Sequence, residues 1–268
     1  MKEKVKTLNF ANIHVTKVHE FLDRFNQFDE NLLLELTESE LYAKTYTPDR
    51  SAIKYSSLPF EEVLQLKEDV VLPELLKIGL INIKQYQHAL KFLDSSEQVS
   101  LGIDYLNLAG LDVEEESVAT KTCLNNNKNL QFSFGNGSLS IYGTITNEKF
   151  FNEIANIEEP IFEFNLELEE LLKVKKFAAI DKIANDINVT CDKNSDIYFE
   201  NQNFKYKIDS QNTTDSESKK TSNTARFPKS YLNMLDGESY KVSVGTNRLV
   251  FVSTDSKTYL VVGRNDKS

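Results

Sequence analysis

The chain has 268 residues, of which 40% are hydrophobic and 27% are charged. This length and composition are those of a globular protein of roughly two domains and exclude a disordered or fibrous chain. Its 31 Lys+Arg and 41 Asp+Glu give a formal net charge of −10, which argues against a simple nucleic-acid binder with a basic surface.

Two helices are expected in the first half of the chain, each followed by alternating strands. Residues 17–28 place Phe21, Leu22 and Phe25 on one helical face, and Thr16 suits the N-cap. Residues 84–93 repeat this apolar stripe. The strands expected in this half are 32–36, 41–46, 99–104, 130–134 and 139–145, with an Asn-Gly turn at Asn136 before the last.

The second half repeats the order of helix and strands twice more. A third helix is expected over 166–182 from its apolar spacing. A fourth is expected over 228–235, with Pro228 in its first turn and Asp236-Gly237 ending it. The strands expected here are 187–191, 196–200, 204–208, 240–244, 248–252 and 259–262.

These repeats predict an α+β fold with two tandem domains, each carrying two helices on one face of an antiparallel sheet. The domains are expected at 1–145 and 161–268, joined by a connector over 146–160, where the alternation is weak. The polar stretch 210–223 is expected to be a mobile loop, and the stretch 105–129 has no assigned role.

The sequence offers no support for an active site, a metal site or a cofactor. His14 and His19 are five residues apart, which is not a metal-ligand spacing, and no phosphate-binding glycine loop or nucleophile elbow occurs. Cys123 and Cys191 lack the spacing of a metal cluster and are expected to be reduced thiols in a cytoplasmic protein. No run of about 18 apolar residues occurs, so no membrane span is expected.

Positive charge is concentrated on the four expected helices. They hold 9 Lys+Arg against 6 Asp+Glu, a balance of +3, whereas the rest of the chain holds 22 against 35, a balance of −13. Lysine-rich helix faces also occur for solubility alone, so charge by itself leaves both interpretations open. The basic residues in question are Lys17, Arg24, Lys84, Lys91, Lys173, Lys175, Lys176, Lys182 and Lys229.

Three passages carry a resemblance to a known family. They are Ile83–Leu93 followed by Val99–Ile103, then Phe162–Lys176, and finally Leu235–Val244, the closing helix and strand. Together with two tandem domains, an acidic total and basic helices, they make the chain similar to the DNA sliding clamps. That family includes proliferating cell nuclear antigen and the bacteriophage DNA polymerase processivity factors.

The resemblance implies a homotrimeric ring that encircles duplex DNA without sequence specificity and tethers the replicative DNA polymerase. An ATP-dependent clamp loader would open the ring, and the clamp itself would be no enzyme and need no cofactor. The basic helix residues named above would face the DNA. Partner peptides would bind an apolar groove beside the connector, at Phe150, Phe151, Ile154 and Ile157. A phage-encoded clamp would work in the host cytoplasm.

Two other interpretations remain open from the sequence. The first is an oligomeric α+β structural or interaction protein, such as a virion component, with no role on DNA. The second is an enzyme with an unrecognised carboxylate pair among the 41 acidic residues.

Overall fold

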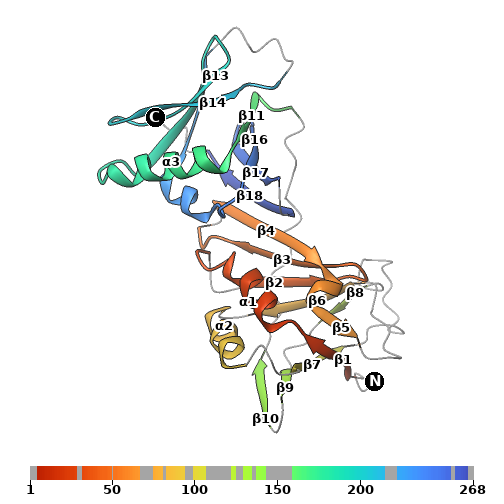
Figure 1. Ribbon diagram of the computed structural model, residues 1–268. Coiled ribbons are helices and arrows are strands. Elements are labelled where there is room, and N and C mark those ends of the chain that lie inside the picture. Colours follow the sequence, from red (N-terminus) through yellow and green to blue (C-terminus); the bar gives the residue numbers. More distant parts are fainter. Residues whose placement is uncertain are drawn as a thin grey trace. The chain divides into compact units, whose positions relative to one another are not determined.

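The computed structural model divides the chain into two compact units (Figure 1). The first consists of Met1–Thr45 and Ser57–Phe150, and the second of Tyr46–Ser56 and Phe151–Ser268. The structure describes residues 5–28, 32–49, 51–66, 75–80, 83–93, 99–106, 122–124, 129–134, 137–142, 159–214, 222–254 and 257–264.

The first unit is a sheet with two α-helices, α1 (Val15–Asp23) and α2 (Ile83–Phe92). Its strands follow the order β10-β9-β7-β8-β6-β2-β3, with β1 pairing β7 on one side and β5 on the other. The pairs are antiparallel except for β6 with β8. The remaining elements are β1 (Val5–Ile13), β2 (Leu32–Leu36), β3 (Glu40–Tyr46), the 3-10 turn η1 (Phe60–Glu62), β5 (Leu64–Leu66), β6 (Leu75–Leu80), β7 (Val99–Leu106), β8 (Thr122–Leu124), β9 (Asn129–Phe134) and β10 (Gly137–Tyr142).

The core of the first unit lies under α1 and α2, which pack on each other (Figure 1). From α1 and the turn after it, Phe21, Leu22 and Phe25 are buried, and α2 buries Tyr86 and Leu90. Burial raises the pKa of Tyr86 to about 12, because the phenolate would lose its hydration. Each helix therefore presents its opposite, polar face to solvent.

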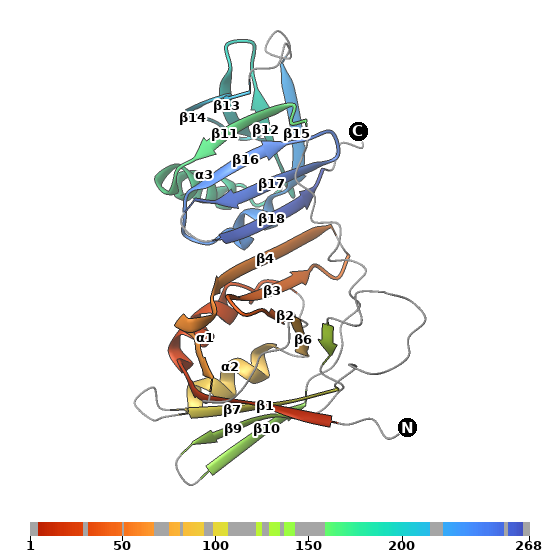
Figure 2. The same cartoon turned by 90° about the vertical axis from the view of Figure 1, so that its right-hand side faces the viewer.

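The second unit holds two sheets, with α3 and a short 3-10 helix, η5, packed beside each other (Figures 1 and 2). One sheet has the order β4-β18-β17-β16-β11, the other β14-β13-β12-β15. The elements are β11 (Phe162–Leu166), α3 (Leu168–Ile180), β12 (Asp186–Cys191), β13 (Asp196–Glu200), β14 (Lys205–Gln211), β15 (Asn223–Pro228), η5 (Lys229–Met234), β16 (Tyr240–Val244), β17 (Arg248–Ser253) and β18 (Lys257–Gly263); β4 spans Ala52–Pro59.

Residues Tyr46–Ser56 belong to the second unit although they come from the first part of the sequence. The Gly263 N–H donates to the Ser51 carbonyl at 2.8 Å, and the rings of Tyr55 and Tyr259 stack with centroids 4.4 Å apart. Lys54 is only 1% exposed, and its Nζ lies 2.8 Å from both carboxylate oxygens of Asp236. The same ammonium donates to the Met234 carbonyl at 3.0 Å, at the end of η5. A strand and a buried charge pair thus anchor this segment.

The expected α+β class is confirmed, and most expected strands are present within one or two residues. The helix boundaries differ. The first helix begins at Val15 with His14 at the N-cap, so Thr16 lies inside it, and it ends at Asp23 instead of residue 28. The third begins only at Leu168, because the alternating Phe162–Leu166 forms a strand.

The fourth expected helix is a 3-10 helix of six residues. Seven of the described strands were not expected: β1, β4, β5, β6, β8, β11 and β15. In the expected loop 210–223, β14 extends to Gln211 and β15 begins at Asn223; residues 215–221 lie outside the described residues. So do residues 143–158, with most of the expected connector. Among the described residues no helix is long and apolar enough to cross a membrane.

The Lys54–Asp236 pair yields a stability prediction. Replacing Asp236 by Ala should lower the free energy of unfolding by about 3 kcal/mol, because a buried ammonium loses its counter-ion. Adding Lys54→Met should restore part of that loss, since the unpaired charge is then removed. Urea denaturation followed by circular dichroism measures both.

The control is Glu169→Ala, which breaks the exposed Glu169–Lys173 pair and should cost much less. Equal losses for Asp236→Ala and Glu169→Ala would show that the buried pair does not anchor the segment.

Candidate nucleic-acid interface

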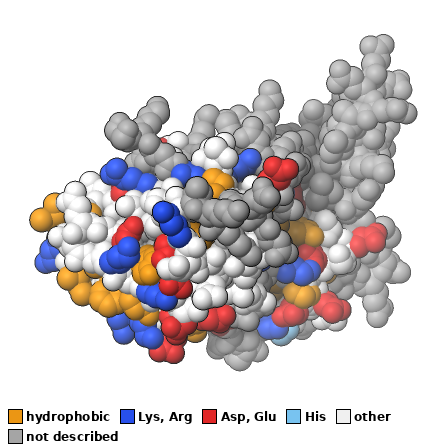
Figure 3. Space-filling view, turned by 90° about the horizontal axis from the view of Figure 1, so that it is seen from above, with side chains coloured by type: hydrophobic (Ala, Val, Ile, Leu, Met, Phe, Trp, Pro, Cys, Tyr) orange, Lys and Arg blue, Asp and Glu red, His pale blue; other side chains and the backbone are white. Residues whose placement is uncertain are grey.

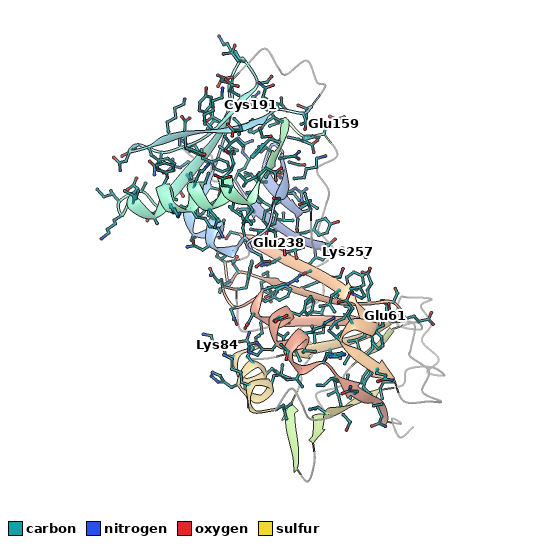
Figure 4. All side chains as sticks on the ribbon, viewed as in Figure 1. Glu61, Lys84, Glu159, Cys191, Glu238 and Lys257 are labelled. Atoms are coloured by element: carbon teal, nitrogen blue, oxygen red, sulfur yellow. The ribbon has the colours of Figure 1, made fainter. Side chains whose placement is uncertain are left out.

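In the first unit the predicted DNA-facing residues lie on or beside the exposed faces of α1 and α2. Lys84 and Lys91 are exposed on α2, and Figure 4 shows Lys84 directed away from the strands. Lys17 is exposed on α1, with its Nζ 3.1 Å from Glu62 Oε2 of η1. Arg24 caps the C-terminus of α1, with its guanidinium 5.9 Å from the centroid of the Phe21 ring. Lys17 therefore has a partner, whereas Lys91 has no ion pair within the described residues.

A hydrogen-bonded cluster centred on Asp23 connects α1 to α2. The Gln87 side chain of α2 donates to Asp23 Oδ1 at 2.9 Å, and Asn26 donates to the same oxygen at 2.9 Å. His19 Nδ1 lies 3.2 Å from the other carboxylate oxygen. Of these contacts, the Gln87–Asp23 hydrogen bond joins the two helices.

In the second unit the lysines of α3 differ in their surroundings. Lys173 pairs with Glu169 at 2.8 Å, and this carboxylate raises the pKa of Lys173. Lys175 is half-buried and donates to the Leu235 carbonyl at 2.7 Å; burial lowers its pKa. Lys176 is exposed and forms no ion pair with any described residue. Of the three, Lys176 is the one whose charge is fully available to a ligand.

The last two predicted residues lie where α3 ends near η5. Lys182 is exposed, one residue after Asp181, and has no ion pair among the described residues. Lys229, the first residue of η5, donates through Nζ to the Asp181 carbonyl. Lys175 and Lys229 thus hold backbone carbonyls of their own unit, a role that their spacing in the sequence did not indicate.

The observed boundaries keep the charge balance expected from the sequence. Within α1, α2, α3 and η5 there are seven lysines against four acidic residues, again a balance of +3. In Figure 3 the basic side chains are nevertheless interspersed with acidic and hydrophobic ones. The basic side chains therefore form no continuous patch over that view.

The structure also shows apolar side chains that the sequence analysis did not single out. Ile180 is 75% exposed and Ile183 is 84% exposed, at and just beyond the end of α3. Phe177 packs its ring against Phe204 and Tyr206, at 5.9 and 5.2 Å between centroids. The sequence did contain a signal for these exposed apolar side chains. The α3 segment has more apolar residues than one buried stripe of a helix can hold.

The predicted partner groove cannot be placed. Phe150, Phe151, Ile154 and Ile157 lie outside the described residues. Within the described residues, no group of three or more His, Cys, Asp and Glu side chains could hold a metal ion.

Strands with two helical elements recur in both units. Comparison with solved structures shows this to be the fold of the DNA sliding clamps over nearly the whole length of the chain.

Three structures of proliferating cell nuclear antigen (PCNA) illustrate the similarity. A. fulgidus PCNA, with the C-terminal region of FEN-1 bound to it, matches with a TM-score of 0.60 and 16% identity, covering 98% of this chain and 99% of that one. PCNA from Thermococcus kodakaraensis matches at 0.57 and 11% identity, covering 98% and 100%. PCNA from Entamoeba histolytica matches at 0.60 and 10% identity, covering 97% and 98%. No protein-family model and no curated protein matches the sequence.

The lysines of α3 provide a test of the local geometry. In a titration of isotopically labelled lysine side chains followed by NMR, Lys175 should lose its proton below the ordinary pKa of 10.5, and Lys173 above it. Because folding lowers the pKa of Lys175, the fold should gain stability from this group as pH rises from the folded pKa to the unfolded one. Glu169→Gln should lower the pKa of Lys173 and leave Lys175 unchanged. Lys175 titrating above Lys173 would contradict the burial of its ammonium.

Proposed function

We propose that this protein is a sliding clamp: a DNA polymerase processivity factor that encircles duplex DNA and tethers the replicative polymerase. The observation that carries the proposal is the sliding-clamp fold over 97–98% of the chain, combined with helical elements that hold a positive balance in an acidic protein. Its action on DNA is that of a non-enzymatic scaffold without a cofactor.

The charge distribution suits a protein that slides. A few exposed ammonium groups, such as Lys84, Lys91 and Lys176, give weak, salt-dependent contacts with phosphates and read no base sequence. The acidic remainder of the chain repels DNA from other surfaces. Weak contact suffices, because a closed ring retains DNA by its topology.

The strand pattern supports self-association edge to edge. In the second unit, β4 comes from the first half of the chain and lies next to β18, the last strand of the second half. By order along the chain, β14 in the second half is the counterpart of β4, and β10 in the first half is the counterpart of β18. Each lies at the end of its sheet, with a ladder partner on one side only among the described strands. Such edges are templates for pairing with another chain, and β10 of one copy would pair with β14 of the next.

The partners follow from this function. They are duplex DNA, a DNA polymerase, an ATP-dependent clamp loader that opens the ring, and further copies of this chain in a homotrimer. A. fulgidus PCNA binds the C-terminal region of FEN-1, and for this chain we place peptide binding at Phe150, Phe151, Ile154 and Ile157 of the connector. The phage-type clamps are the branch of the family that the sequence resembles, with action in the host cytoplasm.

The oligomeric state is testable directly. Native mass spectrometry and sedimentation at micromolar concentration should give a species of about 92 kDa, three times the 30.7 kDa chain. A protein that remains a monomer at these concentrations and fails to stimulate its polymerase would overturn the proposal and leave the structural or interaction protein as the better interpretation.

The helix faces provide a second test. Reversing Lys84, Lys91 and Lys176 to Glu should abolish processive synthesis and lower duplex affinity at least tenfold, because each reversal replaces a phosphate contact by repulsion. Fluorescence anisotropy with duplexes of unrelated sequence measures the affinity, and sedimentation checks that the oligomer is intact.

The matched control reverses Lys193, Lys241 and Lys257, which are exposed on strands or turns and carry the same total charge. This control variant should lose much less affinity for duplex DNA than the variant with Lys84, Lys91 and Lys176 reversed. If the two triple variants bind equally, charge on the helices has no special role in DNA contact.

A further inference from the structure

The first unit contains a cleft of about 410 Å³ where the end of β1 meets η1 and β5. Its described lining residues are Asn12, His14, Phe60, Glu61, Leu64 and Gln65. No lysine or arginine is among them, so this cleft differs in charge from the basic helix faces described above. The ligand that it suits follows from the charge and the hydrogen-bonding groups of these side chains.

Backbone pairing and ring packing hold the walls of this cleft in place. In the ladder of β1 with β5, Asn12 lies opposite Gln65, directly after a register shift. The two amide side chains therefore share one face of the strand pair. On the other wall, the Phe60 N–H donates to the Ser39 carbonyl at 2.8 Å, and the Phe60 ring lies 5.9 Å from the ring of Phe10. The cleft is thus formed by the fold itself.

Glu61 gives the cleft its charge. It lies in η1, is exposed and forms no ion pair with any described residue, and Figure 4 shows it at the surface of the first unit. With histidine neutral, Glu61 is the only charged side chain among the described lining residues. The next carboxylate differs, because Glu62 already pairs with Lys17 at 3.1 Å. The cleft therefore attracts cations and repels anions such as phosphate.

The other lining groups suit a planar organic cation. The side chains of Asn12 and Gln65 form no hydrogen bond with any described residue, so both amide oxygens can accept one. Phe60 and Leu64 are each 6% exposed and add apolar surface. A metal ion is less suited, since the described residues contain no group of three or more His, Cys, Asp and Glu side chains that could hold one.

We propose that this cleft binds an arginine side chain of a partner protein. The guanidinium pairs with Glu61 and donates to the amide oxygens of Asn12 and Gln65, since this planar group carries several N–H donors. Its methylene groups lie against Phe60 and Leu64. The inference goes beyond the proposed function, because it involves neither DNA nor the connector, and its failure leaves the clamp function unaffected.

The first test titrates the full-length protein with N-acetyl-L-arginine amide and follows the methyl NMR signals of Leu64. These signals should shift in a saturable manner with a millimolar dissociation constant, while those of Leu249, buried in the second unit, stay in place. N-acetyl-L-citrulline amide has nearly the same shape without the charge and should bind about fivefold more weakly. Equal binding of the two probes, or no saturable shift, would overturn the proposal.

Two further probes test the chemistry of the ligand. N-acetyl-L-lysine amide should bind more weakly than the arginine probe, because an ammonium is compact and strongly hydrated. Free L-arginine should bind no more tightly than the blocked probe, because its α-carboxylate finds no Lys or Arg among the described lining residues. Lysine binding as tightly as arginine would refute the guanidinium assignment, and tighter binding of free arginine would refute a protein partner.

A pair of matched variants tests the role of Glu61. Glu61→Gln keeps the size of the side chain and should weaken binding of the arginine probe about fivefold, because an exposed ion pair is lost. The control is Glu62→Gln, which removes the neighbouring carboxylate of η1 that pairs with Lys17 and does not line the cleft. This control should weaken binding by less than about twofold. Equal losses would show that the general negative charge of η1, and not the cleft, attracts the probe.

Discussion

The burial of the apolar helix stripes is the constraint on which the proposed function depends. Because Phe21, Leu22, Tyr86 and Leu90 must be removed from water, α1 and α2 can lie against the strands in only one rotation about their axes. That rotation turns Lys84 and Lys91 outward, where both are exposed. A hydrogen bond from Gln87 to Asp23 also joins the two helices. A core that forms for hydrophobic reasons thus also orders the positive charge, and it does so in a protein with a net charge of −10.

The second unit reaches a similar plan by a different route. Its sheet takes in residues Tyr46–Ser56, and the buried Lys54 meets both Asp236 and the end of η5. This charge pair lies beside the carbonyl that holds Lys175. Five lysines of this unit consequently fall into two groups: Lys54, Lys175 and Lys229 stabilise the fold, whereas Lys176 and Lys182 remain available to a ligand. Counting charges by element cannot make that distinction.

The sequence predicted the α+β class, the repeat and most of the strands, because alternation and helical spacing are local patterns that the core preserves. It missed β4 and β11 for two physical reasons. The partner of β4 in the second unit, β18, is distant in sequence, and Phe162–Leu166 runs directly into a helix whose apolar spacing masks the alternation before it. The partners of most individual basic residues could likewise not be predicted from the sequence. Lys17 finds a carboxylate of η1 and Lys229 finds a carbonyl through contacts that only the folded chain creates. Lys173 differs, because its partner Glu169 lies four residues away in the same helix.

The central claim is that copies of this chain close into a ring that surrounds DNA, and electron microscopy of the purified protein tests it most directly. Two-dimensional class averages should show a closed ring with a central hole wide enough for duplex DNA, and images with added duplex should show density within that hole. Compact particles without a hole, or duplex bound along the outer rim, would contradict the account.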